Sequence, residues 1–283
     1  MLKRILVPTD FSPTSERAFR YALEVASRTG GTVVLYHVYE QVEAGFIDNE
    51  TKRTAYNQQM ETDLLKELNR MNVKYQAAFP KVIVSTVLGH APVVDNVLGF
   101  AEEHRMDTIV MGTQGATGLK KTLLGTIASR IAEKSDWPVW LIPEAYEWKL
   151  PQHLVLATDY QLADKKALPL LTAIASVFGA DITVTRIISG HITREETAKE
   201  QARFSEYSNL LQKDFAASSL SFQLITSSSI IDTLEHLEEE IPYDLLTMVR
   251  LKKTFLQRFF TESFTRNMAY LTRHPFLVMA DDA

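Results

Sequence analysis

The chain carries the same arrangement of elements twice, and this repeat limits the possible folds more than any other feature. One segment, RILVPTDFSPTSERAF, begins with a short apolar run that ends in Thr9-Asp10. A second, HLVLATDYQLADKKAL, begins in the same way and reaches Thr158-Asp159. Each continues into a stretch with apolar residues near every third or fourth position and then into a second β-branched run. We therefore expect two domains built on one plan.

The ends of the two copies agree as well, since SDWPVWLIP matches TRHPFLVMA through Pro138 and Pro275. These prolines are 137 residues apart, whereas Asp10 and Asp159 are 149 apart, so the second copy is shorter. We expect the excess in residues 41–56, a polar insertion without a clear period. The predicted boundaries are 1–145 for the first domain and 151–283 for the second, with a linker at 143–152.

The order of apolar runs and helical periods in the first copy predicts the fold class. Apolar runs are found at 3–7, 32–38, 82–88, 107–111 and 138–142, and helical periods at 14–29, 57–71, 92–104 and 125–135. Alternation of this kind with short connections indicates parallel strands joined by right-handed crossovers. Runs such as VVLYHV are nearly continuously apolar, which is typical of strands buried on both faces. The sequence predicts an α/β fold, with a parallel sheet between helices in each domain.

Composition excludes several classes of protein. The formal net charge of −5 argues against binding to a nucleic-acid backbone, which needs a basic face. Cysteine is absent, so neither a disulfide framework nor a thiolate nucleophile is available. No run approaches the length of a membrane span, and the first apolar run stops at Pro8, too soon for a signal peptide. We expect a cytoplasmic protein without membrane or nucleic-acid partners.

A stretch rich in glycine follows the fourth apolar run. Residues 111–126, MGTQGATGLKKTLLGT, contain four of the eleven glycines of the chain. Open parallel sheets bind ligands beyond the carboxyl ends of their strands, and glycine amides approach phosphate oxygens closely because no Cβ intervenes. Gly112, Gly115 and Gly118 can supply such a cradle, and the helix after Thr126 adds free N–H groups. The alternative is that these glycines only shape a strand-to-helix turn.

The spacing of this stretch is neither a Walker motif nor the dinucleotide fingerprint. It reads Gly112-x2-Gly115-x9-Gly125-Thr126. Together with VPTD at the end of the first strand and SDWPVWLIP at the fifth, it resembles the universal stress protein family. The resemblance covers the whole chain as a tandem pair of Rossmann-like domains. It implies a five-stranded parallel sheet of order 3-2-1-4-5 in each domain, and ATP binding as in one branch of the family.

The resemblance also implies a set of nucleotide-binding residues. Asp10, with Pro8 and Thr9, would meet the ribose and adenine side, and Val38 would line the adenine pocket. The phosphates would lie against the glycines. The full set is Pro8, Thr9, Asp10, Val38, Met111, Gly112, Gly115, Gly125, Thr126 and Ile127. Whether Mg²⁺ accompanies ATP stays open, and two residues have structural alternatives: Asp10 as a helix cap and His37 as a packing residue.

The second copy lacks the glycines. An ungapped alignment from Pro275 places Val249 at the position of Gly112, Lys252 at that of Gly115, Glu262 at that of Gly125 and Ser263 at that of Thr126. Side chains would block the amides, and Glu262 would repel phosphate by about 4 kcal/mol at 4 Å and an effective dielectric constant near 20. We therefore expect one nucleotide site per chain, and we interpret Asp159 as structural.

Three functions stay open. The first, which we favour, is an ATP-binding regulator of the stress response that is recognised by an unknown protein partner. The sequence favours it because we find no catalytic base and no spacing typical of metal ligands. The alternatives are a slow ATP hydrolase or nucleotidyl-handling enzyme, and an interaction scaffold that binds no nucleotide. The apolar fifth strands, PVWLIP and PFLVMA, are expected to pair within the chain, and a homodimer stays open.

Overall fold

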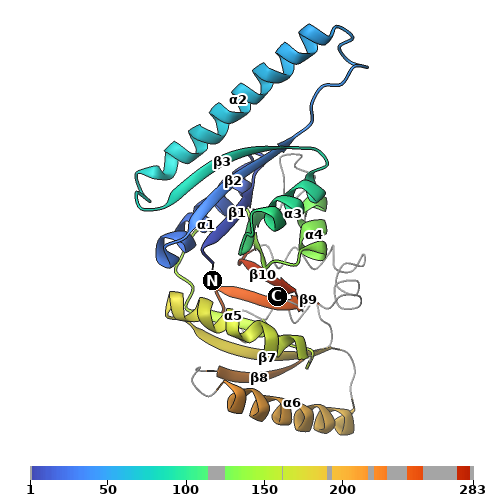
Figure 1. The fold of residues 1–283 in the computed structure, drawn as a ribbon. Helices are drawn as coiled ribbons and strands as arrows, with labels where there is room; N and C mark the ends of the chain where they lie inside the picture. Colours follow the sequence, from blue (N-terminus) through green and yellow to red (C-terminus); the bar gives the residue numbers. More distant parts are fainter. Residues whose placement is uncertain are drawn as a thin grey trace. The chain divides into compact units, whose positions relative to one another are not determined.

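The computed structural model describes residues 2–113, 125–160, 162–189, 193–215, 220–227, 241–250 and 273–280, without the side chains of 162–164, 189, 227 and 250. Its elements fall into two compact units, the first holding β1 to β5 and the second β6 to β10 (Figure 1). Each unit is described by itself below. The domain boundaries at 145 and 151 stay a prediction.

Strands and helices alternate in both units. The first unit contains β1 (Arg4–Pro8), α1 (Pro13–Thr29), β2 (Thr32–Tyr39), α2 (Glu50–Gln76), β3 (Ile83–His90), α3 (Val93–Glu103), β4 (Thr108–Gly112), α4 (Thr126–Lys134) and β5 (Val139–Ile142). The second contains β6 (His153–Ala157), α5 (Leu162–Phe178), β7 (Asp181–Ser189), α6 (Arg194–Asp214), β8 (Leu220–Ser227), β9 (Leu245–Arg250) and β10 (Phe276–Ala280).

All strand pairs within each unit are parallel. The order is β3-β2-β1-β4-β5 in the first unit and β8-β7-β6-β9-β10 in the second, which is the same order counted from each unit's first strand. In register, Pro8 of β1 lies beside Tyr36 of β2, and Ala157 of β6 lies beside Thr185 of β7. The predicted α/β class and the order 3-2-1-4-5 are confirmed.

Helices cover both faces of the first sheet. Tyr36 stacks on Phe100 of α3 with ring centroids 4.5 Å apart, whereas Tyr39 donates its hydroxyl hydrogen to Glu61 of α2. Side chains three positions apart in a strand point to opposite faces, so α2 and α3 lie on opposite sides of the sheet. On the α2 side, Phe19 of α1 packs edge-on against Tyr75 of α2 at 5.9 Å.

The second helix is longer than its apolar period predicts. We expected it at 57–71 after an irregular insertion, but it begins at Glu50 because the Asn49 side chain caps it, accepting from the Lys52 N–H at 3.0 Å. The segment before it is braced against its first turns: the Val42 N–H donates to Asn57 Oδ1 at 3.0 Å, and Asn57 Nδ2 donates back to the Val42 carbonyl at 3.2 Å. Much of the excess length of the first copy is therefore helix.

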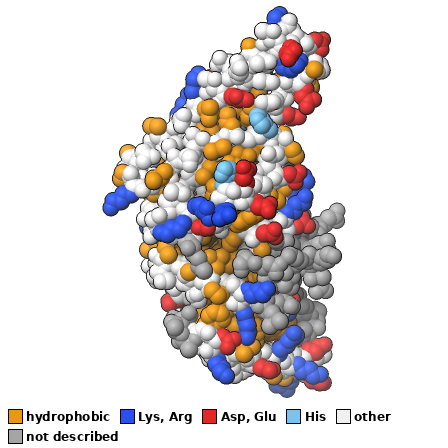
Figure 2. Space-filling model, viewed as in Figure 1, with side chains coloured by type: hydrophobic (Ala, Val, Ile, Leu, Met, Phe, Trp, Pro, Cys, Tyr) orange, Lys and Arg blue, Asp and Glu red, His pale blue; other side chains and the backbone are white. Residues whose placement is uncertain are grey.

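The outer edge of the first unit is open to solvent. β3 is the last strand of its sheet, and Ile83 at its start is 69% exposed. Val73 near the end of α2 is 71% exposed. Figure 2 shows hydrophobic side chains gathered there, at the left of the view, where α2 ends and β3 begins.

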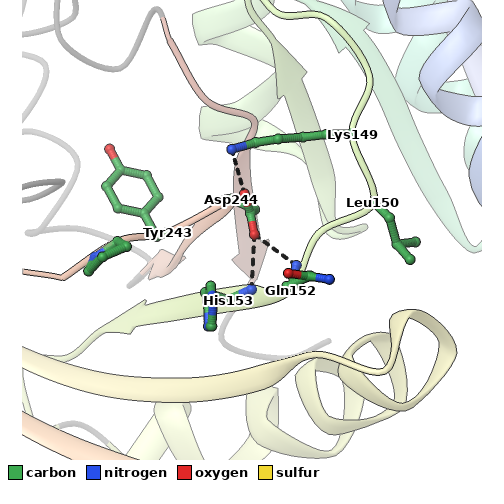
Figure 3. Close-up of a pocket in the computed structure, with 7 residues that line it drawn as sticks. Lys149, Leu150, Gln152, His153, Tyr243 and Asp244 are labelled. Atoms are coloured by element: carbon green, nitrogen blue, oxygen red, sulfur yellow. Dashed lines mark hydrogen bonds and ion pairs between the residues drawn. The ribbon is translucent and has the colours of Figure 1, made fainter.

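An aspartate joins the amino ends of two strands in both units. Asp107, just before β4, accepts hydrogen bonds through Oδ2 from the backbone N–H groups of Lys3, at 2.6 Å, and Arg4, at 3.1 Å. Asp244, just before β9, accepts in the same way from the N–H groups of residues 152 and 153, at 2.8 and 3.1 Å (Figure 3). In each unit, the aspartate carboxylate accepts the hydrogen bonds of backbone N–H groups at the place where the parallel pairing of the two strands begins.

Asp244 is ionised in the fold. Burial raises the pKa of its carboxyl, but the Lys149 ammonium at 2.7 Å and the two backbone donors outweigh this, so the pKa lies below its ordinary value. A carboxyl whose pKa is lower in the folded chain stabilises the fold above the unfolded-state pKa of about 3.9 and loses that contribution as the pH falls through the folded value.

We predict that Asp244→Asn lowers the free energy of unfolding by about 2 kcal/mol at pH 7, because two backbone donors lose a charged acceptor. The loss should shrink toward pH 3, where the wild-type carboxyl takes up its proton. Urea unfolding followed by circular dichroism at both pH values measures it. Asp181→Asn, at an exposed aspartate of β7, is the matched control. An equal loss at both pH values would contradict the ionised carboxylate.

Candidate functional site

The carboxyl ends of β1, β2 and β4 meet at one edge of the first sheet. β1 pairs with β2 on one side and with β4 on the other, through Leu6 beside Ile109. The ladder with β2 continues beyond the strand, since the Thr9 N–H donates to the Tyr36 carbonyl at 2.9 Å. Residues that follow β1 and β4 therefore emerge next to each other at the point where the strand order reverses, which is where open α/β sheets bind ligands.

The residues after β1 form a tight turn into α1. Phe11 has a left-handed backbone with φ of 63°, and its N–H donates to the Thr9 hydroxyl oxygen at 3.1 Å. Ser12 is the N-cap of α1 and accepts from the Ser15 N–H at 3.2 Å, with Pro13 at the first helical position. Asp10 accepts from the Ser12 N–H at 3.1 Å. The alternative in which Asp10 caps the helix is therefore wrong: Ser12 does so, and Asp10 supports the turn.

His37 lies against this turn from β2. Its Nδ1–H donates to the Thr9 carbonyl at 2.7 Å, because a carbonyl oxygen can only accept, and its ring lies 4.5 Å from the ring of Phe11. Val38, the next residue, is half-buried. Sequence reasoning left His37 between packing and pocket lining and did not single out Phe11. The structure gives His37 a defined packing role at the carboxyl edge of the sheet.

The helix that follows the glycine stretch begins without a side-chain cap. Gly125 is its N-cap, makes no capping hydrogen bond and donates its N–H to the Thr113 carbonyl at 2.6 Å. This bond holds the start of α4 beside the end of β4. The first turn contains no acidic residue, and Thr126 and Ile127 are exposed. Free N–H groups at such a helix start attract anions. Gly115 and Gly118 lie outside the described residues.

Packing alone requires a glycine at position 112, independently of any ligand. A Cβ built there would lie 2.7 Å from the Thr14 Cγ2 atom and 3.0 Å from the Thr14 carbonyl carbon, in the first turn of α1. Real Cβ atoms do not approach other atoms so closely. The absence of a side chain therefore lets α1 start directly over the end of β4. Met111, one residue earlier, is 6% exposed and belongs to the core.

The corresponding edge of the second unit is occupied by its own side chains. Thr158 donates its N–H to the Thr185 carbonyl at 2.9 Å as Thr9 does to Tyr36, which makes Asp159 the counterpart of Asp10 and Arg186 that of His37. Arg186 Nη1 forms an ion pair with Asp159 Oδ1 at 2.8 Å. The guanidinium lies 5.2 Å from the ring centre of Tyr160, which has a φ of 61° as Phe11 has 63°.

Two residues of α6 also contact Tyr160. The Arg203 guanidinium from α6 lies 4.7 Å from its ring centre, and its hydroxyl donates to Glu200 at 3.1 Å. Burial and the neighbouring Glu200 carboxylate raise the pKa of Tyr160 to about 12. The carboxylate of Asp159 is thus engaged by an arginine in the second unit, whereas the first unit has a histidine bound to the backbone at that place.

The aspartates before the fourth strands also fix the alignment of the glycine positions. Asp107 and Asp244 make the same contacts, so the fifth residue after each is equivalent, and Val249 stands where the first unit has Gly112. Val249 is 5% exposed in β9. Lys252, Glu262 and Ser263 lie outside the described residues.

A pocket of about 490 Å³ opens in the second unit at the opposite edge of the sheet, beside the Lys149–Asp244 ion pair. Figure 3 shows Tyr243 on one side of this ion pair and the linker residue Leu150 on the other. The pocket lies at the amino ends of β6 and β9, away from the strand ends where ligands of such sheets bind. Among the described helices, none combines the length and apolar character needed to cross a membrane.

Comparisons with known proteins agree with the fold. The model of the universal stress protein family matches residues 1–143. The chain is similar to universal stress protein MJ0531 of Methanocaldococcus jannaschii, with 30% identity over half of this chain and 82% of that protein. Universal stress protein MJ0577 of the same organism is 27% identical over half of this chain and 95% of its own length. A solved universal stress protein from Archaeoglobus fulgidus covers 99% of this chain and 97% of its own at 15% identity with a TM-score of 0.66, a likeness of fold.

We predict that Gly112→Ala destabilises the first unit by about 1–3 kcal/mol, the usual effect of forcing a methyl group into a packed contact. Thermal and urea unfolding of the variant measure the loss. The control is Gly99→Ala in the middle of α3, where a Cβ meets nothing within 4 Å. That change should raise the free energy of unfolding by about 0.5–1 kcal/mol, because alanine is more favourable than glycine inside a helix. A neutral Gly112→Ala variant would show that α1 can retreat from β4.

Proposed function

The chain belongs to the universal stress protein family, and on this basis we propose that its first unit binds ATP at the carboxyl ends of β1, β2 and β4 and acts as a regulator. The observation that carries the proposal is the uncapped start of α4, held beside β4 by the Gly125–Thr113 hydrogen bond. A helix start without a side-chain cap, next to a strand that ends in glycine, suits a polyphosphate.

The proposed site uses the residues implied by the family motif. Asp10 meets the ribose hydroxyls with Pro8 and Thr9 beside it, and Val38 lines the adenine. The phosphates lie along Gly112, Gly115, Gly125 and Thr126, with Met111 and Ile127 flanking them. In support, Asp10 follows β1 and Gly112 ends the neighbouring strand β4. The first turn of α4 has no carboxylate to repel phosphate. Mg²⁺ would neutralise phosphate charge further if it accompanies ATP.

The second unit is proposed to bind no nucleotide. Val249 puts a side chain where Gly112 leaves space, and Asp159 is paired with Arg186. A ribose would have to displace that guanidinium, and breaking a partly buried ion pair leaves a charge without its partner. One ATP per chain is therefore expected.

We propose that ATP occupancy of the first unit is read by a protein partner, and that turnover is slow or absent. Phosphoryl transfer needs an oriented nucleophile as well as a pocket. Gln114, a polar residue of the glycine stretch, lies outside the described residues. The absence of cysteine suits the reducing cytoplasm, where we place the protein. The last strands of the units, β5 and β10, are apolar throughout and are proposed to pair within the chain.

Titration calorimetry should show one ATP bound per wild-type chain. Asp10→Ala should weaken binding about tenfold to a hundredfold, because a carboxylate accepting ribose hydroxyls contributes about 1.5–3 kcal/mol. Asp159→Ala changes the equivalent aspartate of the second unit and is the matched control, which should leave the affinity and the stoichiometry unchanged. Two ATP molecules per chain, or equal effects of the two variants, would refute the assignment to the first unit.

A second variant tests the phosphate end. Thr126→Glu places a carboxylate in the first turn of α4, where it favours the helix dipole but repels phosphate. We predict unchanged or slightly higher thermal stability together with loss of most ATP affinity, measured by calorimetry and thermal shift, while Thr126→Ser keeps the affinity. Because the helix is not weakened, loss of binding cannot be ascribed to unfolding. Full ATP affinity in Thr126→Glu would place the phosphates elsewhere.

A further inference from the structure

We propose that the surface formed by α2 and the edge strand β3 pairs with the same surface of a second copy of this chain. The two copies would align β3 with β3 in antiparallel fashion, with the two α2 helices side by side. The proposal concerns assembly alone and does not depend on nucleotide binding.

The edge strand lacks the usual protection against pairing. Exposed edges generally carry lysine, proline, a bulge or a covering segment. β3 reads IVSTVLGH, so none of its eight residues is Lys, Arg, Asp, Glu or Pro. Within the described part of the chain, no strand pairs with it on the side away from β2. The backbone donors and acceptors on its outer side therefore have no strand partner among the described residues, and the strand carries no charge.

The neighbouring helix presents an uncharged stripe beside this strand. Exposed residues recur along α2 at spacings of three and four, which places them on one side of the helix. They are Thr51, Ala55, Gln58, Thr62, Leu65, Asn69, Val73 and Gln76. Leu65 is 38% exposed and Val73 is 71% exposed. Val73, near the end of α2, and Ile83, at the start of β3, add exposed apolar area beside the unpaired strand edge.

Three pairs of opposite charges flank the carboxyl-terminal half of the stripe. Lys66 Nζ lies 2.9 Å from Asp63, Arg70 pairs with Glu67, and Lys74 pairs with Glu16 of α1. A second copy that approaches this half of the stripe therefore meets charges that are already neutralised by a partner in the same chain. Like charges brought together without such pairs would oppose association.

The spacing of the stripe suits a two-fold axis. Thr86, in the middle of β3, donates its hydroxyl hydrogen to Asn69 Oδ1 at 3.4 Å, so Asn69 marks the place on α2 level with mid-strand. Leu65 and Val73 lie four residues before and after it. If the axis passes beside Thr86 and Asn69, Leu65 of each copy faces Val73 of the other copy, so the contact forms twice in the dimer. Such a contact is self-complementary and closes at a dimer.

Sedimentation equilibrium of the full chain tests the proposal. Wild type should have twice the chain mass. Val73→Glu buries an unpaired carboxylate against Leu65, and Ile83→Lys charges the edge strand; each should raise the dimer dissociation constant about a hundredfold or more. Val177→Glu makes the same exchange at a valine of α5 that is 37% exposed, and should leave the mass unchanged. Both Val73 and Ile83 are so exposed that the variants should fold, as circular dichroism checks.

Disulfide trapping tests the position of the axis, since the chain has no cysteine of its own. Asn69→Cys should form a disulfide-linked dimer on oxidation, because the axis brings the two copies of this position together. Gln58→Cys lies on the same stripe eleven residues away, which at 1.5 Å per residue puts its two copies about 33 Å apart, so it should not.

Three results would overturn the proposal. The first is a wild-type chain that sediments at its own mass. The second is an assembly that resists both charge variants or grows beyond the dimer with concentration, which would indicate another contact such as β3 against the edge strand β8. The third is equal trapping of the two cysteine variants.

Discussion

The first strand of each unit lies between two parallel neighbours, and the rest of the structure depends on this placement. β1 and β6 are buried at their central positions, so helices must cover both faces of each sheet. Parallel strands also send all their carboxyl ends to one edge. The strand order reverses at β1, which separates the loops on its two sides and leaves a place for a ligand between them. The same constraint that buries the core therefore determines where chemistry can occur.

The two units show how far that edge can diverge on one scaffold. Each has a Thr-Asp pair after its first strand, an aromatic residue with a left-handed backbone next to it, and a threonine N–H that continues the ladder. The differences lie in what meets these residues. A histidine bound to the backbone leaves the first aspartate in a turn, while an arginine pairs with the second. The residue at this position of the second strand, His37 or Arg186, thus contacts the backbone in one unit and the aspartate in the other.

Much of the fold could be predicted from the sequence because apolar runs and repeats report burial directly. The start of α2 could not, since its first turns are held by the polar side chains of Asn49 and Asn57 and carry no apolar period. The contact of His37 with Phe11 depends on the register of two strands, which no spacing along the chain reveals. Asp107 and Asp244 were overlooked although the signal was present: both copies have an aspartate just before the fourth strand. For the proposed nucleotide site, the motif indicated the residues but not the close approach of Thr14 that makes Gly112 necessary.

Those two aspartates lie at the amino ends of the strands, on the far side of each sheet from the proposed ligand edge. The residues that anchor the strands and the residues proposed to bind the ligand therefore lie at opposite edges of the same sheet. After a duplication, one copy can exchange its glycines and its histidine without loosening the junction that starts its sheet. In related chains, the residues at the amino ends of the strands should then be retained in both units. The residues at the carboxyl ends should be retained in only one unit.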